Sequence, residues 1–595
     1  MGRTAILVCE DLEGPALQIA QILELFSVPW KQFVPRTLAD SASEDTNGPY
    51  CVLAPMPLVG RVLMDQSVGD ALPPLLQKAE SIFLFGGDNS AATQSMLQMM
   101  SRCATARIAQ IQRKEITCSI SDRRADLCGP MSGLDARVPV RGTQLAMVAI
   151  SNEGCVDPLI STEEGCIFAV VDFKQSRCYL APSPAIIDIS LPLEKAYFDV
   201  AEHFFSAVPL VMYLRHAFKD TIAAPADNGA CLVVDDPVLR PKYGFFDFHR
   251  VSEMAAEHHF TCTVAFIPWN WKRTRPSVAQ LFQSSAGRLS LSIHGCDHSG
   301  REFGTSDAQA LNARAKLAVS RMEKHRIRSG LAHEPLMIFP QGVFSAVSLA
   351  VLKHNGFVAA INTEVSPVDR EARTEIGEVW QMAIRRYSDF AIYTRRYPFH
   401  GLHNFAFDLL LGKPCIIVAH SGDFSDEGGE LLDFIDRLNS LKSKLTWRPL
   451  GDVIRHAFQQ KVRADGVHQI TMFGNEISVE NSGGSSWHIA VEKLEHCPEG
   501  VDRVEIAGTE VRFAADRGRL RFELDLGGRD SALIRVSYKD IYGSPRHKRP
   551  LGTQVKQVAR RYLSEFRDES QARAPWVYGL AQKARSWGNR LPSTH

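Results

Sequence analysis

The sequence predicts an α/β protein whose centre is a distorted parallel β/α barrel. An open α/β sheet precedes the barrel, and a β-sandwich with a helical basic tail follows it. Residues 1–220 alternate apolar strands with helical patterns, and six apolar runs in residues 229–460 each end in polar or aromatic residues. Residues 462–545 hold short alternating segments separated by Gly, Asp and Asn, which is typical of a sandwich. Residues 546–595 form the tail.

Composition excludes several classes of protein. The 595 residues are 45% hydrophobic and 23% charged, close to the globular average, which excludes wholesale disorder and a coiled-coil rod. The 67 basic residues balance the 67 acidic ones, which argues against a nucleic-acid partner. No apolar run reaches the roughly 18 residues of a membrane span. Thirteen scattered Cys without a CxxC pair indicate free thiols, and the N-terminus lacks a signal-peptide pattern, so we expect a cytoplasmic protein.

The N-terminal region, residues 1–220, predicts an accessory α/β domain. Its expected strands are Ala5–Cys9, Tyr50–Leu53, Ser81–Phe85 and Cys166–Val171, and its expected helices are Ala16–Phe26 and Ala91–Met100. The residues 86–90 between a strand and a helix could hold an anion at the helix N-terminus, with ordinary turn chemistry as the alternative. The layout is similar to flavodoxin-like or glutamine-amidotransferase-like domains, but the nucleophile elbow of the latter is absent.

Beyond a linker at residues 220–228, the ends of the predicted strands carry chemically active side chains. The strand and end-residue pairs are Cys231–Val234 with Asp235 and Asp236; Thr263–Phe266 with Trp269 and Trp271; Leu289–Ile293 with His294 and His298; Leu336–Phe339 with Pro340, Gln341 and Gly342; Val358–Ile361 with Asn362 and Glu364; and Cys415–Val418 with His420 and Asp423. A parallel barrel gathers these ends on one face, where active sites are built.

Two of these strand ends suggest a metal site. Adjacent Asp side chains on an extended chain point in opposite directions, so one could bind a metal while the other acts as a base. His294 and His298 would complete a His-His-Asp set that leaves positions open for water and substrate. A lone HxxxH is common on helix surfaces, so the prediction depends on the whole constellation.

The middle region, about Gly229 to Phe458, resembles the polysaccharide deacetylase superfamily, with its NodB-homology or carbohydrate esterase family 4-like fold. The resemblance implies that Asp235 is the general base, that Asp236, His294 and His298 bind one divalent cation, and that His420 is the general acid. Zn²⁺ is the expected ion, with Co²⁺, Mn²⁺ and Ni²⁺ as alternatives. The third family motif matches only in Pro340 and Gly342, because Ile338 replaces the Arg that pairs with the base. We therefore expect Arg385 or Arg386 to orient Asp235.

The expected activity is metal-dependent removal of an N-acetyl group from an amino sugar or related amide in glycan or cell-envelope precursor metabolism. Residues expected to contact the carbohydrate are Trp269, Trp271, Pro340, Gln341, Gly342, Arg385 and Asp423. Trp269 and Trp271 would either stack on a sugar or plug the barrel rim. Asp423 would either hold His420 cationic or serve as a turn residue.

Two other functions stay open. A decayed barrel could serve as a non-catalytic carbohydrate-binding or scaffold protein. A glycoside hydrolase would need two carboxyl groups, which Asp235 with Glu364 or Asp423 could supply.

The tail has eleven basic and three acidic residues and a loose apolar stripe. Such a helix could contact an anionic membrane or a protein partner, although docking on the protein's own domains is the favoured alternative.

Overall fold

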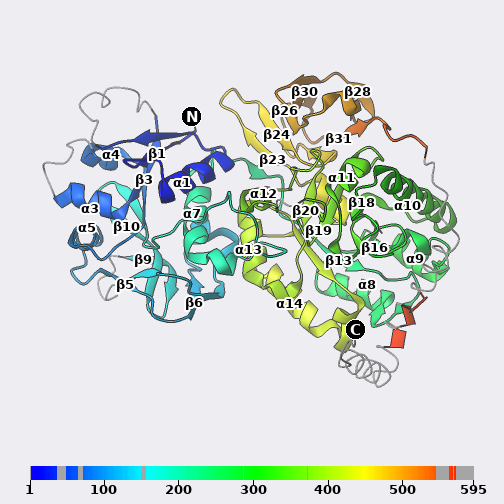
Figure 1. Ribbon diagram of the computed structural model, residues 1–595, viewed down its shortest axis with the longest axis horizontal. Helices are drawn as coiled ribbons and strands as arrows, with labels where there is room; N and C mark the ends of the chain where they lie inside the picture. Colours follow the sequence, from blue (N-terminus) through cyan, green and yellow to red (C-terminus); the bar gives the residue numbers. More distant parts are fainter. Residues whose placement is uncertain are drawn as a thin grey trace, which may run out of the picture.

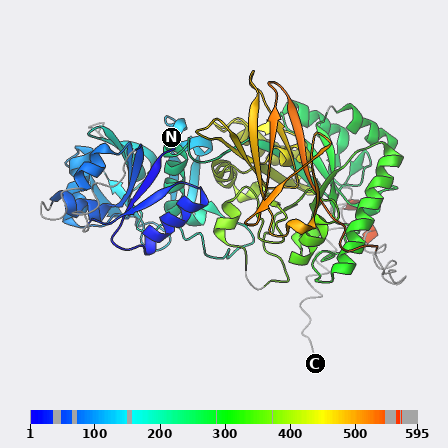
Figure 2. The same ribbon diagram turned by 90° about the horizontal axis from the view of Figure 1, so that it is seen from above.

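The computed structural model describes residues 2–35, 48–64, 72–148, 156–285, 287–370, 373–544, 562–563, 565–566 and 569–570. The N-terminal region lies at one end of an elongated molecule, beside the barrel, and the C-terminal strands pack on another side of the barrel (Figures 1 and 2). Within the described residues, no helix is both long and apolar enough to cross a membrane.

The N-terminal region contains an eleven-stranded mixed sheet. Strands β2, β1, β3, β4 and β11 are parallel neighbours, and the remaining pairs are antiparallel. The strands are β1 (Thr4–Val8), β2 (Trp30–Phe33), β3 (Tyr50–Pro55), β4 (Ser81–Phe85), β5 (Arg107–Gln110), β6 (Glu115–Ile120), β7 (Asp135–Pro139), β8 (Leu145–Val148), β9 (Asp157–Thr162), β10 (Gly165–Phe173) and β11 (Ser176–Ala181).

Helices of this region confirm both helical predictions. They are α1 (Gly14–Leu25), α3 (Met56–Met64), α4 (Leu72–Lys78), α5 (Ala91–Ser101), α6 (Ala125–Cys128) and α7 (Phe204–Ala217). The Ser90 hydroxyl accepts a hydrogen bond from the Thr93 N–H at 3.2 Å and so caps α5. This cap agrees with the turn interpretation of residues 86–90.

The barrel is a sheet of parallel strands in the order β20, β19, β18, β17, β16, β13, β21, with β22 beside β13. Its strands are β13 (Gly229–Asp235), β16 (Cys262–Phe266), β17 (Leu289–His294), β18 (Glu334–Ile338), β19 (Ala359–Asn362), β20 (Ile392–Thr394), β21 (Cys415–Ala419) and β22 (Thr446–Trp447). A parallel bridge between Arg396 and Ile417 joins the β20 edge to β21 and closes the curled sheet. The six predicted strands are confirmed, and β20 and the short β22 are additional ones.

Helices cover the outside of this sheet (Figure 1). They are α8 (Phe248–Glu257), α9 (Pro276–Ser284), α10 (Ala308–Ser329), α11 (Ala346–Lys353), α12 (Ile376–Trp380), α13 (Leu402–Leu411) and α14 (Gly429–Asn439). The short helix α15 (Leu450–Arg455) instead contacts β13, β17 and β18 and shares an apolar cluster with residues of the strands. The barrel strands are apolar and buried on both faces, as expected for a parallel sheet between helices and a filled interior.

The C-terminal region consists of a six-stranded and a four-stranded sheet that share one apolar core. The strands of the larger sheet are β12 (Ala224–Pro225), β23 (Gln459–Val462), β24 (His468–Met472), β26 (Trp487–Leu494), β29 (Ala514–Asp516) and β30 (Arg519–Leu526), and those of the smaller sheet are β25 (Glu476–Glu480), β27 (Val501–Ile506), β28 (Thr509–Val511) and β31 (Ser531–Tyr538). Two features differ from the expected antiparallel sandwich with a separate linker. β24 and β26 pair in parallel, and the predicted linker supplies the edge strand β12.

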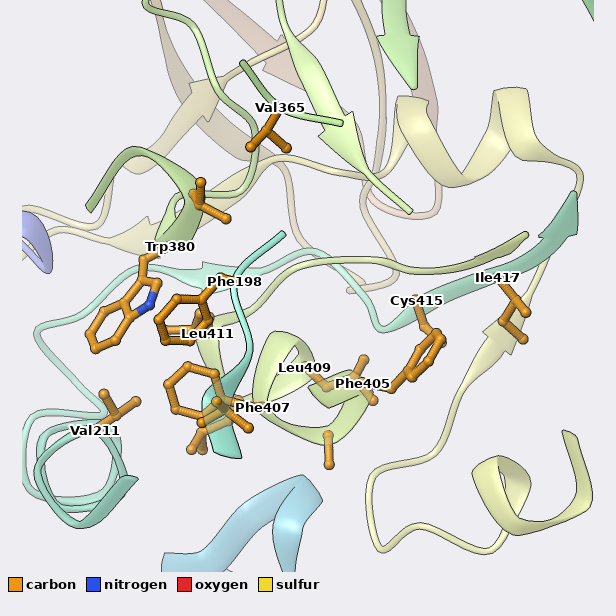
Figure 3. Packing of buried hydrophobic residues seen from close by; sticks show 14 of the residues in the cluster. Phe198, Val211, Val365, Trp380, Phe405, Phe407, Leu409, Leu411, Cys415 and Ile417 are labelled. Atoms are coloured by element: carbon orange, nitrogen blue, oxygen red, sulfur yellow. The ribbon is translucent and has the colours of Figure 1, made fainter. Parts of the chain in front are cut away.

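A buried aromatic cluster joins the N-terminal region to the barrel. Helix α13 packs against α7 (Phe204–Ala217) and against the turn η3 (Val200–His203). Figure 3 shows Trp380 beside Phe198 and Phe407, and both pairs meet edge to face, with ring centroids 5.8 and 5.5 Å apart. Such pairs contribute about 0.5–1.5 kcal/mol each beyond the area they bury. The barrel is thereby held against the N-terminal region through side chains of both.

Part of the basic tail contacts the barrel. Glu565 accepts from Nη2 of Arg273 at 2.7 Å, and the Tyr562 ring meets Trp269 edge to face at 6.0 Å. The remaining prediction for the tail, including its contact with a membrane or a partner, lies outside the described residues.

Candidate active site

The candidate site lies where the parallel strands of the barrel end. Asp235 and His294 are the last residues of β13 and β17, and Arg395 and His420 directly follow β20 and β21. Because all these strands run in the same direction, their carboxyl ends face the same side of the barrel. Figure 1 shows β13 and β16 side by side in this sheet.

Asp236, His294 and His298 bring one carboxylate and two imidazoles together. Their ligand atoms all lie within 4.8 Å of one another, and Oδ1 of Asp236 is 3.2 Å from Nε2 of His298 and 3.6 Å from Nε2 of His294. Nδ1 of His294 lies 3.1 Å from the Ile338 carbonyl, so this nitrogen carries the proton. Nε2 therefore keeps a free lone pair, which is the tautomer a metal ligand requires. The residues fit a divalent cation.

A tight turn brings the two histidines together, and no helix is involved. Gly295 and His298 have positive φ of 61° and 56°. The buried Glu302 carboxylate accepts hydrogen bonds from the backbone N–H groups of Cys296, Asp297 and His298, at 2.8, 3.1 and 3.2 Å. A Cβ at position 295 would collide with Glu302 and Pro340. Glu302 thus organises the loop that carries His298.

Asp235 forms a buried, two-pronged ion pair with Arg395. Nη1 and Nη2 of Arg395 donate to Oδ1 and Oδ2 of Asp235, each at 2.7 Å, and both residues are at most 5% exposed. Burial alone would raise the pKa of Asp235, but the Arg395 charge, with smaller contributions from His294 and His420, holds this pKa well below its usual range. Asp235 is therefore a carboxylate at neutral pH.

The expectation that Arg385 or Arg386 orients Asp235 is wrong. The Arg385 guanidinium lies over the Phe473 ring, 4.3 Å from its centroid. Nη1 of Arg386 pairs with Glu375 and Glu378 at 2.9 and 3.1 Å. Both arginines precede β20, whereas Arg395 directly follows this strand, at the end of the barrel where the candidate site lies.

His420 is exposed and lies next to an aromatic surface. Its ring is stacked with that of Tyr397, with centroids 5.9 Å apart and planes at 13°, and Tyr397 in turn stacks on Phe399 at 4.9 Å. Phe399 is 79% exposed. The Asp423 carboxylate accepts from the backbone N–H of His420 at 2.7 Å, which is the contact of a turn residue.

The partial third motif forms a loop on the neighbouring strands. Gln341 and Gly342 have φ of 58° and 70°, and the Gly342 carbonyl accepts from Nδ2 of Asn362 at 2.8 Å. A Cβ on Gly342 would lie 2.6 Å from Cγ of Glu364. Burial raises the pKa of Glu364. Pro340, Gln341 and Gly342 therefore pass close to Glu364 at the ends of β18 and β19.

Trp269 and Trp271 have protein neighbours. Trp269 lies next to Tyr562 and to the guanidinium of Arg273, whose Cζ is 5.5 Å from the centroids of both rings. Nζ of Lys272 and of Lys324 lie 4.8 and 5.8 Å from the Trp271 centroid, and Lys324 belongs to α10. The aromatic surface next to His420 comes from Tyr397 and Phe399 instead.

Sequence reasoning missed Arg395, Glu302 and Tyr397. Arg395 follows a strand of three residues, Ile392–Thr394, which is too short to stand out by periodicity. The signal that could have revealed this strand is a short apolar run that is followed directly by two arginines, Arg395 and Arg396. Glu302 is visible only as an acidic residue four positions after His298, and its contacts are with the main chain.

The chain is similar to solved structures of carbohydrate deacetylases, the superfamily that its motifs resemble. The carbohydrate deacetylase Agd3 is 8% identical, with 90% of this chain and 99% of that chain covered and a TM-score of 0.49. A putative polysaccharide deacetylase from Mycobacterium smegmatis is 14% identical over 38% of this chain and 90% of that one, with a TM-score of 0.26. A CE4-family pseudoenzyme from Bacillus anthracis is 13% identical over 37% and 64%, with a TM-score of 0.25.

No protein-family model and no curated protein matches the chain. A functional assignment therefore rests on the chemistry of the site itself.

Proposed function

We propose that the protein is a divalent-metal-dependent deacetylase that removes the N-acetyl group from an amino sugar or a related amide. The observation that carries this proposal is the convergence of two groups at one end of the barrel. One is the Asp236, His294 and His298 set, and the other is the Asp235–Arg395 pair. Zn²⁺ is the proposed ion, because imidazole and carboxylate together suit it.

The cation would supply one part of the chemistry. When bound by Asp236, His294 and His298, such an ion lowers the pKa of a coordinated water from 15.7 to about 7 and polarises a carbonyl. The remaining steps fall to side chains of this chain. Asp235 accepts the proton of the attacking water on a carboxylate oxygen, and His420 donates a proton to the leaving amine.

The Arg395 pair defines what kind of base Asp235 is. Each carboxylate oxygen accepts one guanidinium N–H, so each keeps a further lone pair for a proton. A carboxylate with a low pKa is a weak base and works only on an already acidic donor. The role proposed for Asp235 thus depends on an occupied cation site.

The stacked Tyr397 and Phe399 rings supply the proposed contact surface for the sugar. Phe399 presents most of its ring to solvent, and the apolar C–H face of a sugar suits an aromatic face. The substrate would lie with its acetamide toward Asp235 and its ring over Phe399. Its identity as a cytoplasmic glycan or cell-envelope precursor remains a prediction from the sequence.

Glycosidic hydrolysis is a second candidate, because burial raises the pKa of Glu364 as a general acid requires. The two reactions give different products. A glycosidase would release a reducing sugar, and a deacetylase would release acetate and leave a free amine.

The test combines metal analysis of the purified protein with a screen for released acetate, amine and reducing sugar on N-acetylated sugars and their nucleotide-linked forms. We expect one divalent ion per chain and equal amounts of acetate and amine. Asp235→Asn should keep the metal and lose about 10²–10⁴-fold in turnover, since an amide cannot take the proton. A chain that binds the ion and the sugar without releasing any product would instead be a binding protein.

A further inference from the structure

A cavity lies at the end of the barrel opposite the candidate active site, where the three regions of the chain meet. Its volume is about 350 Å³. Its wall includes Phe26 after α1, Ala223 before β12, Trp380 and Arg385 of the barrel region, and Thr471 of β24. Ile384 bridges Ile392, the first residue of β20, whereas Arg395 follows the last one. The cavity is therefore separate from the candidate active site.

Arg385 in this wall is a half-buried cation, two of whose buried donor atoms are unsatisfied. Its Nε and Nη1 are buried and have no hydrogen-bond partner, and its Nη2 lies 3.4 Å from Oε1 of Gln381. No carboxylate of the described residues lies within 4.0 Å of its guanidinium. Burial lowers the pKa of Arg385 to about 10. An unpaired buried charge is costly, so a native protein normally provides it with a partner.

The other polar groups around the cavity add donors. Trp380 is 2% exposed, and its indole N–H has no partner in the described part of the chain. Lys461 and Arg519 also line the wall. Of the two acidic residues there, Glu492 is already paired with Arg519, and Glu24 is exposed. Among the described residues, neither acidic side chain of the wall is thus placed to accept from Arg385 or Trp380.

We propose that this cavity binds the oxyanion group of a small metabolite, a carboxylate or a phosphate, which accepts hydrogen bonds from Arg385 and Trp380. A planar guanidinium presents paired N–H donors that match both kinds of oxyanion. The wall draws on all three regions, so a bound anion would stabilise their packing by mass action. This proposal does not depend on the deacetylase function.

Two probes, inorganic phosphate and acetate, test the proposal on the full chain. Unfolding midpoints and isothermal titration would be measured in chloride buffers of constant ionic strength. We expect one probe or both to raise the midpoint and to bind one per chain, and the stronger probe identifies the phosphate or carboxylate class. Charge-assisted hydrogen bonds contribute about 1.5–3 kcal/mol, so Arg385→Met should weaken binding about 10–100-fold.

Two further variants separate binding from packing. Trp380→Phe keeps an aromatic ring in the cluster but removes the indole N–H together with part of the ring, so it should weaken the binding of the anion, and its stability without the probes gives the cost in packing. Arg386→Gln alters a neighbouring, exposed cation and should bind as the parent does. In the absence of either probe, Arg385→Met should be at least as stable as the parent, since it removes an unpaired charge.

Three results would overturn the proposal. If neither probe raises the unfolding midpoint of the parent protein above its value in chloride alone, and neither binds, the cavity holds water only. Equal binding by the parent and by Arg385→Met would place the anion elsewhere. Arg385→Met could also lose the same stability with and without the probes while its binding of the probes is unchanged. Arg385 would then serve only to pack on Phe473.

Discussion

At the scale of single residues, the Asp235–Arg395 pair sets the electrostatics of the candidate site. Both side chains are buried, so neither is screened by water, and each compensates the other. Removing one partner of such a pair leaves an uncompensated charge, which costs far more than the pair itself contributes. Arg395 is therefore a positioning residue whose loss should be visible in both stability and pH dependence.

Arg395→Met should destabilise the fold by about 3–5 kcal/mol at pH 7, because it leaves the Asp235 carboxylate buried without a cation. The folded-state pKa of Asp235 in the parent is depressed, so its stabilisation is present above the unfolded pKa of about 3.9 and is lost as the pH falls below it. In the variant, burial raises this pKa. The stability gap between parent and variant should narrow on acidification, and the acid limb of the rate profile should move to higher pH.

Urea unfolding at several pH values measures both effects. Arg386→Met, which breaks a partly exposed pair, is the control and should cost less than about 1 kcal/mol. If Arg395→Met matched this control, the buried pair would have no special role.

His420→Ala tests the proposed general acid. An N-acetyl amide must protonate its amine to release it, whereas an activated acetyl ester has a leaving group that departs unaided. The variant should therefore lose about 10²–10⁴-fold on the amide and much less on the ester, with unchanged metal content. Equal losses on the two substrates would assign His420 to another role, such as orienting the substrate next to Tyr397.

At the scale of elements, the loop after β17 decides whether the histidines can share a ligand. The positive φ of His298 and the collision that a side chain at position 295 would cause make this loop dependent on its internal hydrogen bonds. Glu302 provides three of these bonds, including the one to the N–H of His298 itself. The carboxylate therefore accepts hydrogen bonds from backbone N–H groups that have no partner in a helix or a strand.

Glu302→Gln should weaken metal binding about 10–100-fold, in line with other supporting residues around metal ligands. The amide keeps one acceptor oxygen, so its NH2 group would face at least one of the three backbone donors and so loosen the loop. Competition with a chelating dye measures the affinity, and the visible spectrum of a Co²⁺ form reports the ligand geometry. Glu323→Gln, an exposed residue of α10 paired with Arg326, is the control. An unaltered affinity and an unaltered spectrum would show that Glu302 is dispensable for the site.

At the scale of the whole molecule, a buried ion pair connects the barrel to the C-terminal sheets. Nζ of Lys353 on α11 lies 2.7 Å from Oε2 of Glu495, which follows β26 and is fully buried. Tyr538 of β31 donates its hydroxyl proton to the same carboxylate at 2.7 Å. Lys493 is 3.9 Å away, and burial lowers its pKa to about 7. One carboxylate thus serves two buried lysines where the barrel meets the C-terminal sheets.

Glu495→Gln should destabilise the protein by about 3–5 kcal/mol near pH 7, because it leaves both lysines without a carboxylate. The loss should shrink as the pH rises above about 7, where folded Lys493 gives up its proton. Chemical unfolding across this pH range measures the change. Glu499→Gln, with its exposed side chain, is the control. A pH-independent loss would mean that Lys493 keeps its proton in the folded protein.

The sequence alone predicted six strands of the barrel and the placement of Asp235, Asp236, His294, His298 and His420 at their ends. These inferences are local, since an apolar run defines a buried strand and the next residue marks its end. The spacing of His294 and His298 allowed either a helix or a turn, and the structure has the turn. The expected contribution of Arg385 or Arg386 failed because both lie before β20 and not after it.

Only the tertiary structure decided the partners of these residues. Arg395 meets Asp235 across 160 positions of the chain, and the predicted linker pairs with β23 far beyond the barrel. Lys353 and Glu495 likewise come from different regions. Local periodicity reports which face of a strand or helix is buried, but it carries no information about which distant element covers that face. For this protein, the sequence located the ends of the strands, and the closure of the barrel determined which charges compensate one another there.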